Sequence, residues 1–218
     1  MIAETDDRNV VLARIREALQ KRRASVALPP NEEQMGNLLP EVVDPLATFG
    51  SWLQDLGGEF VCCPESELEA VVAGLAVAHQ WRRPAIHHSD LVRLAVGGGQ
   101  PWSSDLLEWD SEVPAETLEC CDVGITGCLA LIAQTGSVLL DTSSAGGRAL
   151  SILPPHHLVI ARREQLMEDL PSAMRAVSDS GSSMISLHTG PSRTGDIERV
   201  LVLGAHGPKK LTVIVVEN

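Results

Sequence analysis

Apolar and polar positions alternate along this chain in blocks that predict an α/β protein. Short apolar runs of strand length recur roughly every 20 to 25 residues and are separated by amphipathic stretches of helical length. Continuous apolar runs are typical of strands buried on both faces of a parallel sheet, with helices as the connections. The expected strands are Glu59–Cys63, Pro84–His87, Asp122–Thr126, Leu129–Ala133, Ser137–Asp141, His157–Ala161, Met184–Leu187, Val200–Leu203 and Leu211–Val216.

Capping residues and apolar periodicity predict the helices. Asp44-Pro45 is a favourable helix start, with Asp as N-cap and Pro as the first helical residue, and Gly57-Gly58 ends that helix after about Leu56. Further helices are expected over residues 65–80, 89–94 and 163–177, with a short one between Arg148 and Pro154.

Three strand-like runs follow one another closely between Asp122 and Asp141. The last two are joined around Thr135-Gly136, a pair typical of a tight turn between antiparallel strands. We therefore expect a mixed sheet, in which a small antiparallel element is inserted in a mostly parallel set.

The first 40 residues differ from the rest. Residues 6–23 predict a helix in which Val11 and Ile15 share one face, and basic residues lie at its carboxyl end. Residues 24–39 contain Pro29-Pro30 and polar side chains, which favour a linker. We expect an N-terminal helix and linker over residues 1–40 and one domain over residues 41–218.

Charge is unevenly distributed over the chain. The formal net charge is −12, and residues 31–122 contain 17 acidic and 3 basic side chains. An acidic middle argues against nucleic acid and anionic membranes as partners. The N-terminus has no apolar signal-peptide core, and the longest apolar stretch is too short to span a bilayer. A cytoplasmic protein without membrane insertion is expected.

The cysteines do not form a recognisable framework. There are five, an odd number, and Cys62-Cys63 and Cys120-Cys121 are adjacent pairs without C-x-x-C spacing. We expect reduced thiols and no cofactor in this chain, in particular no iron–sulfur cluster.

The segment from Gly190 to Lys210 carries most of the candidate chemistry. Gly190-Pro191 is followed by Ser192, Arg193 and Thr194, with Asp196 shortly after. If this loop opens a helical turn, its N–H groups and hydroxyls can hold an anion, and Arg193 adds a fork for a carboxylate or phosphate. The alternative is a well-capped loop with a surface arginine.

A second Gly-Pro pair, Gly207-Pro208, follows the strand Val200–Leu203. His206 beside it is a candidate general acid or base, and Lys209 a candidate anion ligand. A structurally hydrogen-bonded histidine is the alternative. With Asp196, His206 completes the pair of candidate catalytic residues.

A third set consists of Thr135, Gly136 and Arg148. If the hairpin tip and the Gly146-Gly147 turn share one rim, Arg148 can reach a ligand common to both; otherwise it is a solvated arginine.

No metal site is expected from the histidines. His87-His88 and His156-His157 are adjacent pairs, so the two rings of each pair point to opposite faces of their strand, and no carboxylate lies at chelating spacing.

Five motifs in this order resemble the LUD-domain family, and within it the lactate utilization protein C branch. They are DVGITG (residues 122–127), IAQTGSVLL (132–140), GGRALSILPPHHLVI (146–160), TGPSRTGDIE (189–198) and LGAHGPKKL (203–211). Gly195 stands where the family more usually has Ala. The resemblance implies a three-layer fold like that of the NagB/RpiA/CoA-transferase group.

The resemblance also implies a role in oxidising L-lactate to pyruvate, as one of three proteins whose other members carry the iron–sulfur clusters. The first hypothesis is a ligand-binding or accessory subunit in which Arg193, Ser192 and Thr194 hold a carboxylate and His206 moves a proton. The alternatives are a stand-alone enzyme acting on a phosphorylated, CoA-linked or folate-like molecule, and a non-catalytic assembly factor.

Overall fold

The computed structural model describes residues 4–21, 42–97, 105–110, 113–182, 184–195, 201–204 and 207–217. The chain divides into two compact units, Met1–Leu38 and Leu39–Asn218. The first contains helix α1 (Glu4–Lys21), whose apolar side chains Val10, Val11 and Ile15 are exposed. Among the described residues, no helix combines the length and apolar character needed to cross a bilayer.

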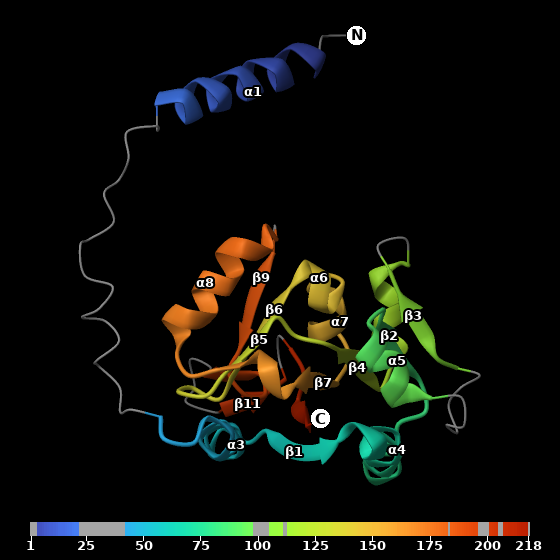
Figure 1. Cartoon of the computed structure of the whole chain (residues 1–218). Coiled ribbons are helices and arrows are strands. Elements are labelled where there is room, and N and C mark those ends of the chain that lie inside the picture. The colour runs from blue at the N-terminus through green and yellow to red at the C-terminus, as the bar shows by residue number, and fades with distance from the viewer. Residues whose placement is uncertain are drawn as a thin grey trace. The chain divides into compact units, whose positions relative to one another are not determined.

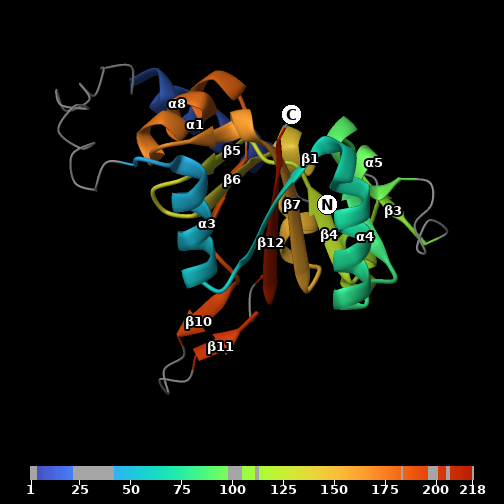
Figure 2. The same cartoon turned by 60° about the horizontal axis from the view of Figure 1, so that its bottom comes forward.

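A six-stranded sheet forms the centre of the second unit (Figures 1 and 2). Every neighbouring pair in it is parallel, as expected for continuous apolar strands joined by crossovers. In spatial order, its strands are β1 (Glu59–Pro64), β12 (Lys210–Glu217), β7 (His156–Arg162), β4 (Val123–Thr126), β2 (Pro84–His87) and β3 (Leu107–Trp109).

Helices α4 (Leu68–His79) and α5 (Asp90–Val96) cover one face of this sheet, as Figure 2 shows. A short 3-10 turn, η2 (Glu65–Glu67), precedes α4, and Ser89 caps α5 by accepting from the Val92 N–H. The two helices bury Leu68, Val72 and Val92 against Leu158 and Ile160 of β7. Burial of aliphatic side chains therefore holds this layer on the sheet.

The opposite face is covered by α3 (Pro45–Asp55) and a second, smaller sheet. Phe49 and Leu53 of α3 pack with Val138 and Leu140 of the second sheet against Val213 of β12. Helix α8 (Leu170–Ser180) lies on the outer side of the second sheet, through Ala173 and Val177. The strand order of this sheet is β8 (Leu166–Met167), β5 (Ala130–Ile132), β6 (Ser137–Asp141) and β9 (Ile185–His188).

Two smaller groups complete the unit. Helix α7 (Ala149–Ile152), after the short α6 (Thr142–Ala145), packs through Leu150 on β2, β3 and the 3-10 helix η3 (Ala115–Cys120). Strands β10 (Arg193–Gly195) and β11 (Leu201–Leu203) pair as an antiparallel hairpin.

The α/β architecture with a mostly parallel sheet and an antiparallel insertion is confirmed, but two local predictions are wrong. Residues 163–177 are not one helix: a 3-10 turn η4 (Arg163–Gln165) and β8 come first, and α8 begins only after Asp169, which accepts from the Ser172 N–H as N-cap. Arg193–Gly195 forms a strand rather than a helical turn, because it pairs with β11.

Candidate functional site

Three strands of the main sheet place polar side chains at its amino edge. Glu59, His156 and Lys210 are the first residues of β1, β7 and β12. Lys210 lies opposite His156 in the register, and Glu59 lies opposite Thr212. Because parallel strands begin at the same edge of a sheet, residues far apart in the sequence meet here.

His79 and Trp81 reach this edge from α4. His79 is the last residue of the helix, and Gln80 ends it in the left-handed conformation with φ 58°. This turn brings the Trp81 ring, which is 6% exposed, onto the rings of His79 and His156 at centroid distances of 5.6 and 5.0 Å.

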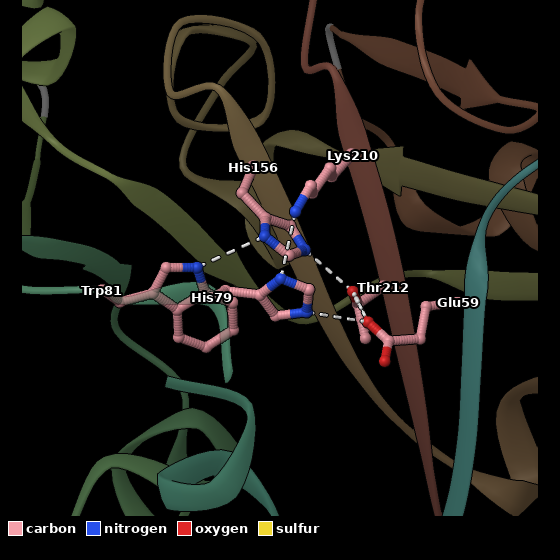
Figure 3. A network of polar contacts seen from close by, with 6 residues as sticks. All are labelled: Glu59, His79, Trp81, His156, Lys210 and Thr212. Atoms are coloured by element: carbon pink, nitrogen blue, oxygen red, sulfur yellow. Dashed lines mark hydrogen bonds and ion pairs between the residues drawn. The ribbon is translucent and has the colours of Figure 1, made fainter. Parts of the chain in front are cut away.

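The six side chains form one hydrogen-bonded chain, shown in Figure 3. The indole N–H of Trp81 donates to Nδ1 of His156 at 3.3 Å, so the proton of this neutral ring is on Nε2, 2.8 Å from the Thr212 hydroxyl. That hydroxyl donates to Oε2 of Glu59 at 2.9 Å. One branch of the chain therefore ends at the Glu59 carboxylate.

The other branch ends at the same oxygen. The ammonium of Lys210, which can only donate, lies 3.2 Å from Nδ1 of His79. Nε2 of His79 is then the protonated nitrogen, and it donates to Oε2 of Glu59 at 3.1 Å. Glu59 thus holds the His79 ring with Nδ1 as a hydrogen-bond acceptor.

A cavity of about 210 Å³ opens beside this chain. Its lining includes His79, His156, Lys209, Lys210 and Asp122. Burial, aided by the neighbouring His79 and Lys210, lowers the pKa of His156 to about 3, so this ring is neutral at physiological pH. The cavity wall therefore carries two cationic lysines and the Asp122 carboxylate, and it is uncharged at His156.

Glu59, His79 and His156 also bring three potential metal-ligand atoms within 4.8 Å of one another. The sequence offered no carboxylate near the His156-His157 pair, and Glu59 supplies one from another strand. A metal-bound histidine normally donates its remaining N–H to an acceptor, whereas Nδ1 of both rings here faces an N–H donor, Trp81 or Lys210. These donors and the lysine charge fit a hydrogen-bonded chain better than a cation.

A second cavity, of about 390 Å³, lies at the carboxyl edge of the same sheet. Its lining includes Ser89, Cys128, Ser144, Arg162 and Gln165. The connections after the neighbouring strands β2 and β4 leave on opposite faces, and such switch points commonly bind ligands.

The strongest donors of this second cavity already have protein partners. The Arg162 guanidinium pairs with Glu65 at 2.6 Å, and the Gln165 amide donates to the Cys128 carbonyl at 2.5 Å. The carboxyl-edge cavity therefore offers fewer uncommitted charges than the amino-edge cavity.

Four of the residues expected to bind substrate gather at the carboxyl end of α3. A Cβ on Gly136 would lie 2.7 Å from Trp52 Cβ, and one on Gly190 would lie 3.0 Å from Leu56 Cβ. The Thr135 hydroxyl hydrogen-bonds to that of Ser137, which in turn hydrogen-bonds to that of Thr189. Arg193 donates to the Leu56 carbonyl at 2.5 Å, which is the position of a helix cap.

The two Gly-Pro loops are adjacent. The Ser192 N–H donates to the Pro208 carbonyl at 2.9 Å, and a Cβ on Gly207 would lie 3.1 Å from Ser192 Cβ. Lys209, by contrast, lines the amino-edge cavity.

Arg148 lies apart from the turn at Thr135-Gly136. It immediately precedes α7, and its carbonyl accepts from the Ser151 hydroxyl. Helix α7 packs against β2 and η3, whereas the turn at Thr135-Gly136 packs on α3. These placements do not bring Arg148 and the turn together.

Three further candidate residues fall at the limits of the described part of the chain. Thr194 lies in β10, with its side chain outside the described residues. Asp196 and His206, the candidate catalytic pair, also lie outside them.

Comparison with known proteins assigns the family. The model of the LUD domain matches residues 12–216. The chain belongs to the LUD domain family. A crystal structure of a DUF162 family protein from Deinococcus radiodurans superposes with a TM-score of 0.59 at 25% identity, covering 79% of this chain and 96% of that one.

Curated relatives of this LUD domain are named Lactate utilization protein C. The protein from Deinococcus radiodurans is 31% identical over 78% of this chain and 79% of its own length. Those from Shouchella clausii and Bacillus subtilis are 37% and 32% identical, and the matches span 50% and 54% of their lengths.

Sequence reasoning missed most of the amino-edge group of this LUD domain: Glu59, His79, Trp81, Lys210 and Thr212. The available signal was positional, since Glu59 begins a predicted strand and His156 and Lys210 directly precede predicted strands. Polar residues that start neighbouring parallel strands share one edge, but the order of strands within the sheet was not readable from the sequence.

Proposed function

We propose that this LUD domain is a component of an L-lactate oxidation system, in which it binds a small anionic ligand and acts with iron–sulfur partner proteins. The observation that carries the proposal is the relationship to the Deinococcus radiodurans Lactate utilization protein C, which extends over 78% of this chain.

The state of the cysteines supports placing the redox centres on partner proteins. Iron–sulfur clusters bind thiolates. Burial raises the pKa of the Cys62, Cys63, Cys121 and Cys128 thiols, which favours their protonated form. Cys63, Cys121 and Cys128 are buried and suit packing better than cluster binding.

Cationic side chains support the proposal that the ligand is a small anion. Arg193 already donates to the Leu56 carbonyl, so its guanidinium is partly used in capping α3. Lys209 and Lys210 line a cavity of about 210 Å³, a size suited to a ligand of few atoms. The amino-edge cavity therefore offers the stronger support for anion binding.

The test is lactate-dependent dye reduction by cells or purified complexes in which this chain is co-expressed with the two iron–sulfur proteins, compared with the same preparation lacking this chain. We expect omission to abolish lactate-dependent reduction and re-addition of the purified chain to restore it. Undiminished reduction without the chain would contradict the proposal and direct the search to a stand-alone enzyme activity.

Removal of this chain from the assembled complex, followed by the same dye-reduction measurement, tests the remaining alternative. A chain that is needed while the complex assembles, yet can be removed afterwards without loss of dye reduction, would act as an assembly factor. A ligand-binding component is required during turnover itself.

A further inference from the structure

The amino-edge cavity is built around two adjacent ammonium groups. The backbone N–H groups of Lys209 and Lys210 both donate to the Pro155 carbonyl, at 2.8 and 3.2 Å. This fixes the start of β12, so both side chains line the same cavity of about 210 Å³. Both lysines are exposed, and a ligand from solution can therefore reach them.

The nearby carboxylates are engaged by other donors. Asp122 accepts the backbone N–H groups of Arg82 and Arg83 at 2.9 Å or less. Glu59 accepts from His79 and Thr212. In the described part of the chain, no carboxylate lies within ion-pair distance of Lys209 or Lys210. Although the protein has a formal net charge of −12, these two adjacent cationic side chains form a local site suited to an anion.

His79 adds a hydrogen-bond acceptor at the same place. Glu59 accepts a hydrogen bond from its Nε2–H, which leaves the Nδ1 lone pair directed at Lys210 and the cavity. A carboxylate that binds the Lys210 ammonium would draw the ammonium away from Nδ1. Nδ1 would then be available to an O–H group on the carbon next to that carboxylate.

The neutral His156 ring closes the back of the cavity. It is 4% exposed and is held from both sides by Trp81 and Thr212. Because both of its nitrogens have partners, it shapes the wall, and His79 is the ring that faces the ligand.

We propose that the amino-edge cavity binds a small 2-hydroxycarboxylate, with Lys209 and Lys210 on the carboxylate and Nδ1 of His79 accepting from the 2-hydroxyl. This inference rests on the proposed function and specifies the ligand class and the residues. It assigns His79, Lys209 and Lys210 to ligand binding, with Glu59 as the residue that positions the His79 ring.

Calorimetric titration of the purified full chain tests the site, with L-lactate, propionate and inorganic phosphate as separate probes. Propionate has the carboxylate but no 2-hydroxyl. We expect L-lactate to bind about tenfold more tightly than propionate in the wild type, since only L-lactate has a 2-hydroxyl that can donate to Nδ1 of His79. Phosphate is expected to compete with L-lactate for the same lysines.

Three variants separate the two parts of the site. Lys210→Met and Lys209→Met keep much of the apolar stem and should each weaken L-lactate and propionate alike by about tenfold. His79→Gln should lower the preference for L-lactate over propionate while leaving propionate binding nearly unchanged. Arg175→Met, at an exposed position of α8, is the matched control and should bind as the wild type does.

Several outcomes would overturn the inference. They are wild-type affinity for L-lactate in both folded lysine variants, equal binding of L-lactate and propionate by the wild type, and no saturable L-lactate binding. Circular dichroism shows which variants are folded, and Lys209→Met carries the test if Lys210→Met is not.

Failure of the site and failure of the proposed function are distinguishable. If the lysine variants bind L-lactate normally but the chain is required for dye reduction, the site is wrong and the function stands. If L-lactate binds as described but dye reduction does not need the chain, the function is wrong and the site stands.

Discussion

His156 and His157 are neighbours in β7 with opposite surroundings, as the alternation of side chains along a strand predicts. His156 joins Trp81 and Thr212 at the amino edge, whereas Nε2 of His157 bonds the Thr126 hydroxyl at 2.9 Å. Nδ1 of His157 is buried without a hydrogen-bond partner among the described residues. Both rings are therefore held in a neutral, desolvated state.

These two histidines predict a loss of stability in acid. Burial lowers the pKa of His156 to about 3 and that of His157 well below the ordinary 6.5. Below pH 6.5 the unfolded chain binds protons that the folded chain does not, so the free energy of unfolding decreases as the pH falls. Each histidine contributes a slope of about 1 kcal/mol per pH unit in this window. Urea unfolding at about pH 7.5 and about pH 5.5 measures it.

The variant His157→Gln removes the contribution of one of the two histidines to this pH dependence of the free energy of unfolding. We expect the drop in unfolding free energy between the two pH values to be smaller by about 1 kcal/mol than in the wild type. The matched control, His88→Gln, makes the same change at a side chain that is 40% exposed, and should alter the drop less. An identical drop in wild type and His157→Gln would mean that His157 binds protons equally in the folded and the unfolded chain.

At the scale of elements, the turn between β5 and β6 shows how the hairpin and α3 fit together. Ile132 pairs with Ser137 across the turn, so the predicted hairpin at Thr135-Gly136 is confirmed. Gly136 has φ +62°, and a Cβ there would lie 2.7 Å from both Trp52 Cβ and the Leu53 nitrogen. This glycine is required for its backbone conformation and for the close approach of α3.

Gly136→Ala is therefore expected to destabilise the protein more than a left-handed conformation alone would. That conformation costs an L-residue about 1 kcal/mol, and displacement of α3 should raise the total to about 3 kcal/mol. Gly181→Ala is a matched control, because Gly181 also has φ +62° but no atom within 4 Å of the added Cβ. Urea unfolding of the two variants gives the difference, and equal losses would refute the close packing of α3 on this turn.

The elements that were predictable from the sequence are those with strong local signals. Ser137–Asp141 and Pro84–His87 have the predicted bounds because each is a short run with buried positions throughout or nearly so. The error at residues 163–177 has a local cause: Asp169 and Pro171 begin a new helix, so the preceding residues are free to pair as β8 with β5. Arg193–Gly195 was misread because its pairing partner β11 lies beyond the loop.

The partition into two sheets was not predictable. The three runs 123–126, 130–132 and 137–141 are all buried at every position, so their apolar patterns are alike. The structure nevertheless places the first in the six-stranded sheet and the other two in the second sheet. Pairing between distant segments decides which sheet each run joins. The same pairing brings Glu59 and His79 to the edge near Lys209, so the sequence alone identified Lys209 as a candidate ligand but not Glu59 or His79.

At the scale of the whole molecule, the apolar core formed by the described residues belongs to one of the two units. Every buried residue of the four apolar clusters lies between Phe49 and Val216, within the unit Leu39–Asn218. The helix α1 of the other unit exposes Val10, Val11 and Ile15. The larger unit therefore contains the apolar burial on which folding depends.

We expect a chain shortened to residues 39–218 to fold and to unfold thermally at the same midpoint as the full chain, within about 2 °C. The family match begins at residue 12, so residues 12–38 are part of what the family shares, although the clusters identified among the described residues lie outside them. Calorimetry of both chains, with L-lactate titration as a second readout, makes the comparison. A lower midpoint for the shortened chain would show that residues 1–38 stabilise the fold. An equal midpoint with unchanged ligand binding would favour a role for these residues in contacts with another protein.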